Sequence, residues 1–453
     1  MKRWGLVWIT AILSCLPILL QRATSPNLLE DSDTAFLLKI IRERQDPSYW
    51  FTHDWPLMNH FYRPISTLPF EMDNALYGNQ AWGYGLTNAL ICCLCVFLLG
   101  WLMRELTDSI PLTVGATALF GLWHWHGLSL VLPWLGHLVW VIAFLGIFRH
   151  GFKIRYWLPA TAAFSFLMSQ LDGMASLYFR MIGWIPGRTA SVMTIFCLLA
   201  MAAYARYERV SALREEAKPT SMDEPAGTRS TVLSDARARV PWVWPVVAMV
   251  ASALAFGSYE QAVMLPAALF GVAVSMRLQR YRVRWGWQIG FWSLLIAYYF
   301  VRKAFLPTGN SDYQLQQFRS GPGVLFSVFG YVLPSIQSLF MQSKMLDLGV
   351  YVLITSQIYS TVWGGLSNVF GLIAAFRHWV LGLTGLALSF FTYLPMAWLN
   401  QFEHYHYWPM SLRSLFVVVL AWGTWELVVI AISPPERKAP PRPAPAPGSL
   451  PHR

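Results

Sequence analysis

The chain opens with an apolar run at residues 4–20, WGLVWITAILSCLPILL, which follows Lys2 and Arg3 and leads into NLLEDSD at residues 27–33. The run is close to the length that a helix needs to cross a bilayer. Basic residues in front of a span favour the cytoplasmic side, so the three carboxylates of the second stretch should emerge on the opposite side. Acids clustered where a helix leaves the membrane predict a site there.

The rest of the chain repeats this apolar pattern. Hydrophobic residues make up 55% and charged residues 13% of the sequence, and the mean hydropathy is +0.42, which is typical of a polytopic membrane protein. Apolar runs of spanning length start near residues 4, 86, 110, 134, 157, 188, 241, 259, 286, 348, 379 and 409. They predict an all-α bundle of about 12 spans in the plasma (inner) membrane, with both termini cytoplasmic and the first run kept as an uncleaved anchor.

The basic segments agree with this alternation of spans. The formal net charge is +11, but most of the Lys and Arg residues fall in segments that the alternation assigns to the cytoplasm, such as Arg149–Arg155, Arg206–Arg239 and Arg277–Arg284. The positive-inside rule therefore explains the excess charge, and no nucleic-acid partner is predicted.

The chain divides into a transmembrane domain at 1–432 and a disordered, Pro-rich cytoplasmic tail at 433–453. The domain contains a first extracytoplasmic loop at 21–87 and a cytoplasmic linker at 206–240. Helical periodicity at Ala35–Ile41 predicts an amphipathic helix in that loop. Asp33 is placed to cap this helix from Thr34. The run Gly323–Gln342 is interpreted as a helix at the outer face that does not span.

All five cysteines lie inside apolar runs, where a thiol behaves as a small hydrophobic group. They predict neither a disulfide nor a zinc site. Three of them are adjacent in Cys92-Cys93-x-Cys95, but neighbouring helical side chains point about 100° apart and do not converge on one ion.

Acids, imidazoles and guanidinium groups collect on the predicted outer side. They are Glu30, Asp31, Asp33, His53, Asp54, His60, Arg63, Asp73, Asn88, Asp172, Arg180, Arg188, Arg302, Lys303, Glu403, His404 and His406. A carboxylate that accepts a proton from a hydroxyl, together with cations that stabilise a departing phosphate, is what sugar transfer from a lipid phosphate requires.

Several motifs carry a resemblance to a known group. They are Asp31-Ser-Asp33, Tyr62-Arg63-Pro64, Leu76-Tyr77-Gly78 leading to Tyr84-Gly85-Leu86-Thr87-Asn88, Trp184-Ile-Pro-Gly187-Arg188, Ser258-Tyr259-Glu260-Gln261-Ala262 with Pro266, Arg302, and His404-Tyr-His-Tyr-Trp-Pro409. In this order the chain resembles GT-C membrane glycosyltransferases, in particular the protein O-mannosyltransferase-like group that uses polyprenyl-phosphate sugars. Gly85 stands where that group usually has His, Tyr259 where it has Lys, and no repeat domain follows.

The resemblance implies transfer of a sugar from a polyprenyl-phosphate donor to a hydroxyl of a protein or an envelope glycan or lipid, at the extracytoplasmic face. Asp31, with Asp33, is the expected catalytic base of an inverting reaction. Arg63, Arg188 and Arg302 are expected to bind the donor phosphate. The expected pocket lining is His53, Asp54, Tyr62, Asn88, Glu260, His404 and His406. No cofactor is predicted with certainty, and a divalent cation stays open without a ligand set.

Other interpretations compete with this one. A transporter or flippase of a lipid-linked sugar would use the same charged cavity without covalent chemistry, and a non-catalytic assembly factor would use the Pro-rich tail. The local alternatives are that Arg63 contacts lipid headgroups, that Glu260 pairs with an arginine, and that His404 and His406 belong to an interfacial aromatic belt.

Overall fold

The computed structural model describes residues 4–128, 180–216, 242–307, 309–321, 378–400 and 402–432, with the single residues 131, 167, 324 and 328. In these residues the secondary structure is helical, apart from one isolated bridge between Phe318 and Leu399. The predicted all-α class is confirmed for this part of the chain.

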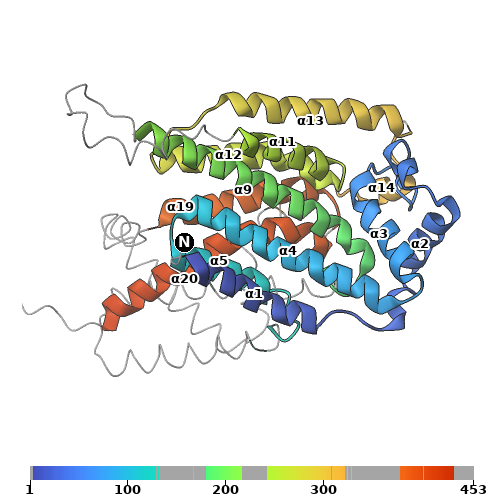
Figure 1. Cartoon of the computed structure of the whole chain (residues 1–453), viewed down its shortest axis with the longest axis horizontal. Helices are drawn as coiled ribbons and strands as arrows, with labels where there is room; N and C mark the ends of the chain where they lie inside the picture. The colour runs from blue at the N-terminus through green and yellow to red at the C-terminus, as the bar shows by residue number, and fades with distance from the viewer. Residues whose placement is uncertain are drawn as a thin grey trace, which may run out of the picture.

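Long helices run side by side in one bundle (Figure 1). They are α1 (Gly5–Leu20), α4 (Ala81–Thr107), α5 (Ile110–Leu122), α9 (Arg188–Glu216), α11 (Val243–Phe256), α12 (Leu265–Leu278), α13 (Gly286–Phe305), α19 (Trp379–Tyr393) and α20 (Tyr407–Ile432). Each lies where an apolar run predicts a span. Apart from residues 167, 324 and 328, the predicted spans that start near 134, 157 and 348 and the run Gly323–Gln342 lie outside the described residues.

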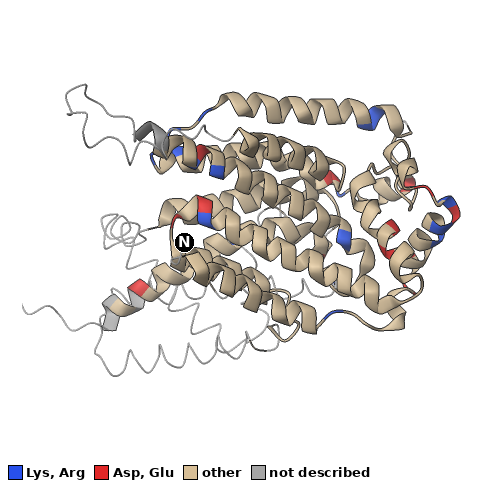
Figure 2. Cartoon of the chain, in the orientation of Figure 1, with Lys and Arg blue, Asp and Glu red and all other residues tan. Residues whose placement is uncertain are grey.

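Among the described residues, four stretches are long and apolar enough to cross a membrane by length and composition. They are Ala81–Thr107, Ile185–Leu213, Glu260–Leu278 and Trp379–Trp398. The structure therefore supports a membrane protein with several spans, and it does not establish the predicted number of about 12. Charged residues gather at the two ends of the bundle, and its middle is mostly uncharged (Figure 2).

The surface of the bundle also suits lipid. On α1, Val7, Ala11 and Ile18 are fully buried, whereas Leu13 and Leu20 on the other face are 57% and 79% exposed. Exposed apolar stripes of this kind are stable when hydrocarbon surrounds them.

Small residues let the bundle helices approach closely. A Cβ at Gly100 of α4 would lie 3.2 Å from the hydroxyl of Thr117 on α5, and one at Gly121 of α5 would overlap Ser14 of α1. Helix pairs in membranes pack through such small residues, because lipid supplies no hydrophobic drive for their association. The same helices place all five cysteines in buried positions without disulfides.

The first loop folds as a cap on one end of the bundle (Figure 1). It forms α2 (Ser32–Arg44), the 3₁₀ turn η3 (Pro47–Phe51) and α3 (Pro64–Tyr77), and α14 (Asp312–Gln317) packs beside them. The predicted amphipathic helix is confirmed, since Leu37, Leu38 and Ile41 of α2 are buried in a cluster with aromatic residues of the loop. We call this end of the molecule the loop end.

The predicted linker begins too early in the sequence. Helix α9 continues through Glu216, so residues 206–216 are helical. Arg206 pairs with the buried Glu105 of α4 at 3.4 Å, and Arg209 pairs with Asp108. The charges that suggested a solvated linker are used to join α9 to α4. Residues 217–241 and the tail at 433–453 lie outside the described residues.

Candidate functional site

Helix α2 is capped by Asp31. Oδ2 of Asp31 accepts hydrogen bonds from the backbone N–H of Thr34 at 3.2 Å and from its hydroxyl at 3.1 Å. The indole Nε1 of Trp184 donates to the same oxygen at 3.0 Å. The prediction that Asp33 caps this helix is therefore wrong, because the helix begins at Ser32 and Asp33 lies inside its first turn.

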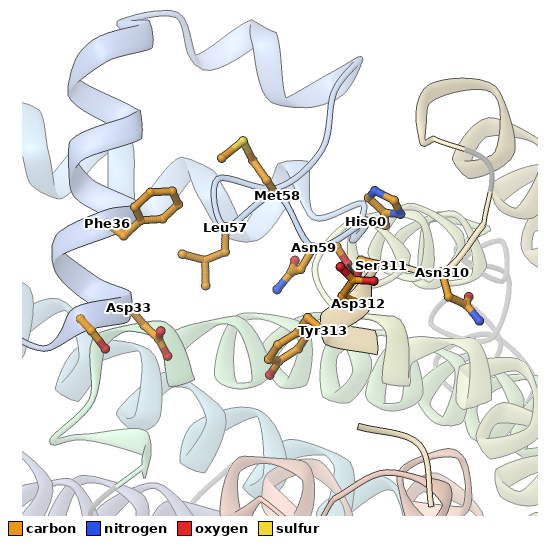
Figure 3. Close-up of a pocket in the computed structure, with 11 residues that line it drawn as sticks. Asp33, Phe36, Leu57, Met58, Asn59, His60, Asn310, Ser311, Asp312 and Tyr313 are labelled. Atoms are coloured by element: carbon orange, nitrogen blue, oxygen red, sulfur yellow. Dashed lines mark hydrogen bonds between the residues drawn. The ribbon is translucent and has the colours of Figure 1, made fainter. Parts of the chain in front are cut away.

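A cavity of about 730 Å³ opens beside this first turn (Figure 3). Its wall comes from α2, from the loop that follows η3 and from the start of α14. It is lined by Ser32, Asp33, Phe36, Leu57, Met58, Asn59, His60, Asn310, Ser311, Asp312 and Tyr313. Figure 3 shows Asp33 and Tyr313 approaching from opposite sides, with Asn59 pointing toward the space between them. The volume lies within the range of about 300–1,000 Å³ that small-molecule sites occupy.

The loop that carries Asn59 is organised by Asp54. Oδ1 of Asp54 accepts from the backbone N–H groups of Trp55 and Phe61 at 2.8 and 2.9 Å, and Oδ2 accepts from that of His60 at 2.8 Å. Met58 and His60 have φ angles of 50° and 60°. Asp54, which the sequence predicts as a pocket-lining residue, does not line the cavity. It holds the loop in shape, and residues 57–60 of that loop line the cavity.

Arg180 supplies a cation next to the capped end of α2. Its guanidinium lies 4.9 Å from the ring centre of Trp184 and 5.9 Å from that of Phe402. The guanidinium makes no hydrogen bond or ion pair to any residue that the structure describes, although it acts electrostatically on Asp33 and Glu403. Its N–H donors are therefore available for an anion.

The carboxyl groups near Arg180 are perturbed by their surroundings. Partial burial raises the pKa of Asp33, and the nearby charge of Asp31 raises it further, against the opposing effect of Arg180. Burial likewise raises the pKa of Glu403, again opposed by Arg180. A carboxylate with a raised pKa is a stronger base at neutral pH.

Arg63 is already neutralised. It donates from Nε and from one terminal nitrogen to Oε2 of Glu260, at 2.9 and 2.6 Å, and its guanidinium lies over the rings of Phe61 and Tyr259 at 4.1 and 4.4 Å. The alternative that Glu260 pairs with an arginine is confirmed. Arg63 is only 9% exposed, so it does not offer a free cation to a donor phosphate.

Arg188 and Asn88 lie inside the bundle, away from the cavity. Arg188 is fully buried and pairs with Asp73 at 2.6 Å, donates to Oδ1 of Asn88 at 2.7 Å, and reaches the carbonyls of Pro69 and Tyr84. Because its donors are engaged and it has no solvent contact, the structure gives it no access to a donor phosphate. Asn88 is likewise fully buried and does not line the cavity.

Three other predicted residues do not line the cavity. A terminal nitrogen of Arg302 is 3.5 Å from the backbone oxygen of His60. The hydroxyl of Tyr62 donates to the carbonyl of Phe51 at 2.9 Å, and His53 stacks on Tyr49 with ring centres 3.8 Å apart. The contacts of Tyr62 and His53 fix loop geometry, whereas Nε of Arg302 is buried without a hydrogen-bond partner among the described residues.

His404 packs against the same two rings, Trp184 and Phe402, that Arg180 lies over. Its ring centre lies 5.5 Å from that of Trp184 and 5.6 Å from that of Phe402. Burial lowers the pKa of His404 to about 3, and the charges of Arg63 and Arg180 lower it as well. His406 instead stacks on Tyr393 with ring centres 4.9 Å apart.

The segment Trp184–Arg188 has three structural roles. Trp184 binds Asp31, Arg188 pairs with Asp73, and Gly187 leaves room for the carbonyl oxygen of Arg180, which a Cβ would overlap. Arg180 is among the residues that the sequence places on the outer side, but no role was predicted for it. Its position four residues before Trp184 is the sequence feature that connects it with this segment.

Asn59 and Tyr313 were missed altogether. Each lies in a connecting segment without a motif. The hydroxyl of Ser311 donates to the backbone oxygen of Asn59 at 3.1 Å, although the two residues are 252 positions apart. Only the folded chain brings them to one cavity.

Within the described ranges, no group of three or more His, Cys, Asp and Glu side chains is placed to hold a metal ion. The divalent cation therefore stays a prediction without ligands. Comparisons of the chain with protein-family models, with curated proteins and with solved structures find no match.

Proposed function

We propose that this protein transfers a sugar from a polyprenyl-phosphate donor to an acceptor hydroxyl at the loop end of the bundle, on the extracytoplasmic face of the membrane. The observation that carries the proposal is that Asp33 lines a cavity of about 730 Å³ and lies within electrostatic reach of Arg180, a cation that forms no ion pair with the described residues. A base and a free cation beside a cavity are the groups that this chemistry requires.

In the proposed reaction the acceptor oxygen bonds to the anomeric carbon as the bond from that carbon to the phosphate oxygen breaks. The hydroxyl proton passes to Asp33, and the electron pair of the broken bond leaves with the polyprenyl phosphate. Arg180 stabilises the charge that develops on the phosphate. A single displacement of this kind inverts the anomeric configuration.

The roles of the two acids differ from the expectation drawn from sequence. Asp33 lines the cavity, so it is the proposed base. Asp31 is a positioning residue, since its Oδ2 holds both the start of α2 and the indole of Trp184, over which Arg180 lies. Asp31 thus connects the first turn of α2, which carries Asp33, with Trp184, on which the guanidinium of Arg180 lies.

The place of the cavity suits a lipid donor. It lies at the end of a bundle whose helices are long and apolar enough to cross a membrane, where charged residues gather (Figure 2). The phosphate of a polyprenyl carrier lies at the level of the headgroups while its chain stays in hydrocarbon.

Reconstituted protein with labelled polyprenyl-phosphate sugars and hydroxyl acceptors tests the proposal. Asp33→Asn should lower the transfer rate by about 10²–10⁴-fold, the usual contribution of a general base. Donor binding should be retained in that variant. Arg180→Gln should weaken donor binding, and Asp31→Asn should keep much of the activity because its amide oxygen still accepts hydrogen bonds.

Lys39→Gln is the matched control, because Lys39 is an exposed residue of α2 whose partner is Glu43 on the same helix. No transfer from any donor, or unchanged transfer by Asp33→Asn, would contradict the proposal. So would a product with retained configuration. Movement of the lipid-linked sugar across proteoliposomes without glycoside formation would favour the flippase alternative.

A further inference from the structure

The cavity contains a buried amide that the proposed chemistry does not use. Asn59 is only 9% exposed, and its Oδ1 is shielded from solvent without a hydrogen-bond partner. Its Nδ2 makes no hydrogen bond to the described residues either. A buried polar group without a hydrogen-bond partner destabilises the fold, so most such groups are paired in native structures. An amide of this kind in a cavity wall indicates a ligand that supplies the missing partners.

Two other polar side chains of the wall, both exposed, also lack partners among the described residues. Asp312 and Asn310 are exposed, and their side chains make no hydrogen bond within the described part of the chain, while Asp33 supplies a further carboxylate across the cavity. Carboxylates accept, and an amide both donates and accepts. A ligand that carries several hydroxyl groups can satisfy both kinds of group at once.

Aromatic rings complete the wall. Phe36 and Tyr313 are 39% and 43% exposed, and Phe61 meets the ring of Tyr313 edge to face at 6.4 Å. A sugar ring has hydroxyls at its edge and C–H groups on its faces, so it suits a site that combines amides, carboxylates and aromatic faces. An extended peptide is usually bound along a strand edge, and the described wall contains none.

We infer that this cavity binds a carbohydrate, so that the acceptor is a glycan hydroxyl rather than a serine or threonine of a protein. The acceptor role rests on the proposed function, because only the chemistry of Asp33 makes the bound sugar a reactant. Asn59 is a specificity-determining residue that pairs with hydroxyls of the acceptor ring.

Binding without a donor tests the inference. The full-length protein in nanodiscs is titrated with maltotriose, mannotriose, chitotriose and a Ser/Thr-rich peptide, and binding is followed by saturation-transfer NMR. At least one oligosaccharide should bind saturably, and Asn59→Ala should weaken that binding by about tenfold, the upper value for one hydrogen bond.

Asp312→Asn is a second variant. Because Asp312 is exposed, its substitution should leave the fold intact, so that a change in oligosaccharide binding reports on the cavity. Asn79→Ala is the matched control, since Asn79 is exposed and does not line the cavity. Absence of saturable oligosaccharide binding would overturn the inference, as would peptide binding that depends on Asn59.

The two proposals fail in different ways. Transfer to the peptide, without oligosaccharide binding, would remove the glycan acceptor and leave the glycosyltransferase proposal standing. Oligosaccharide binding that depends on Asn59, without transfer from any polyprenyl-phosphate donor, would establish the carbohydrate site and remove the transfer reaction.

Discussion

At the level of single residues, the buried pair of Arg188 and Asp73 allows a test of whether Arg188 stabilises the fold or binds the donor phosphate. Arg188→Met should reduce the free energy of unfolding by about 3–5 kcal/mol, because it leaves the carboxylate of Asp73 buried without its partner. Thermal unfolding in detergent measures the loss, and the double variant with Asp73→Leu should recover most of it. A stable Arg188→Met protein with weakened donor binding would restore the phosphate role expected from sequence.

The neutral imidazole of His404 predicts a pH dependence of stability. Its folded pKa of about 3 lies below the usual value of 6.5, so the unfolded chain takes up a proton at higher pH than the folded one. The stabilisation is complete above pH 6.5 and should fall by up to about 1.4 kcal/mol per pH unit below that, down to pH 3.

His404→Gln removes this titration. Unfolding measured from pH 7 to pH 5 should therefore be less steep with pH in the variant than in the unmodified protein. Parallel profiles would show that folding does not lower the pKa of His404.

At the level of elements, Gly85 fixes how α4 meets the chain leaving α1. A Cβ at this position would overlap the carbonyl oxygen of Ala23. Replacing Gly by Ala inside a helix usually stabilises it by up to about 1 kcal/mol, but here the overlap should reverse the sign and cost about 1–3 kcal/mol.

Gly286→Ala is the matched control, because a Cβ at Gly286 of α13 meets nothing within 4 Å. Thermal unfolding of both variants compares the two positions. Equal stabilisation by the two substitutions would show that the backbone at Ala23 shifts to accommodate a Cβ, and that position 85 of α4 does not require glycine.

The sidedness of the whole molecule can be tested by labelling. All five native cysteines are buried, so a membrane-impermeant maleimide should give a low background. Ser32→Cys at the loop end should react in intact cells, whereas Arg277→Cys at the end of α12 should react only after permeabilisation, as the positive-inside rule predicts. The opposite pattern would place Asp33 in the cytoplasm and remove the proposed donor.

The sequence predicts those features of the molecule that are written locally. Apolar runs locate the bundle helices, and the spacing of Leu37, Leu38 and Ile41 locates α2. The predicted start of α2 is wrong because both Asp31 and Asp33 suit an N-cap. In the structure Asp31 is the cap, and it also accepts a hydrogen bond from Trp184, which lies 153 positions away. The free cation of Arg180 and the unpaired amide of Asn59 depend on which distant groups do or do not reach them.

The pairing of Arg63 with Glu260 has a consequence for biogenesis. The two residues are 197 positions apart, so the ribosome completes the early helices before the neutralising carboxylate exists. Until then the nascent chain holds a guanidinium at the membrane surface without the counter-charge of Glu260, which lies in the 3₁₀ turn before α12. We expect chains truncated before Glu260 to be recognised by membrane quality control, and the loop end to mature only once the later helices have been inserted.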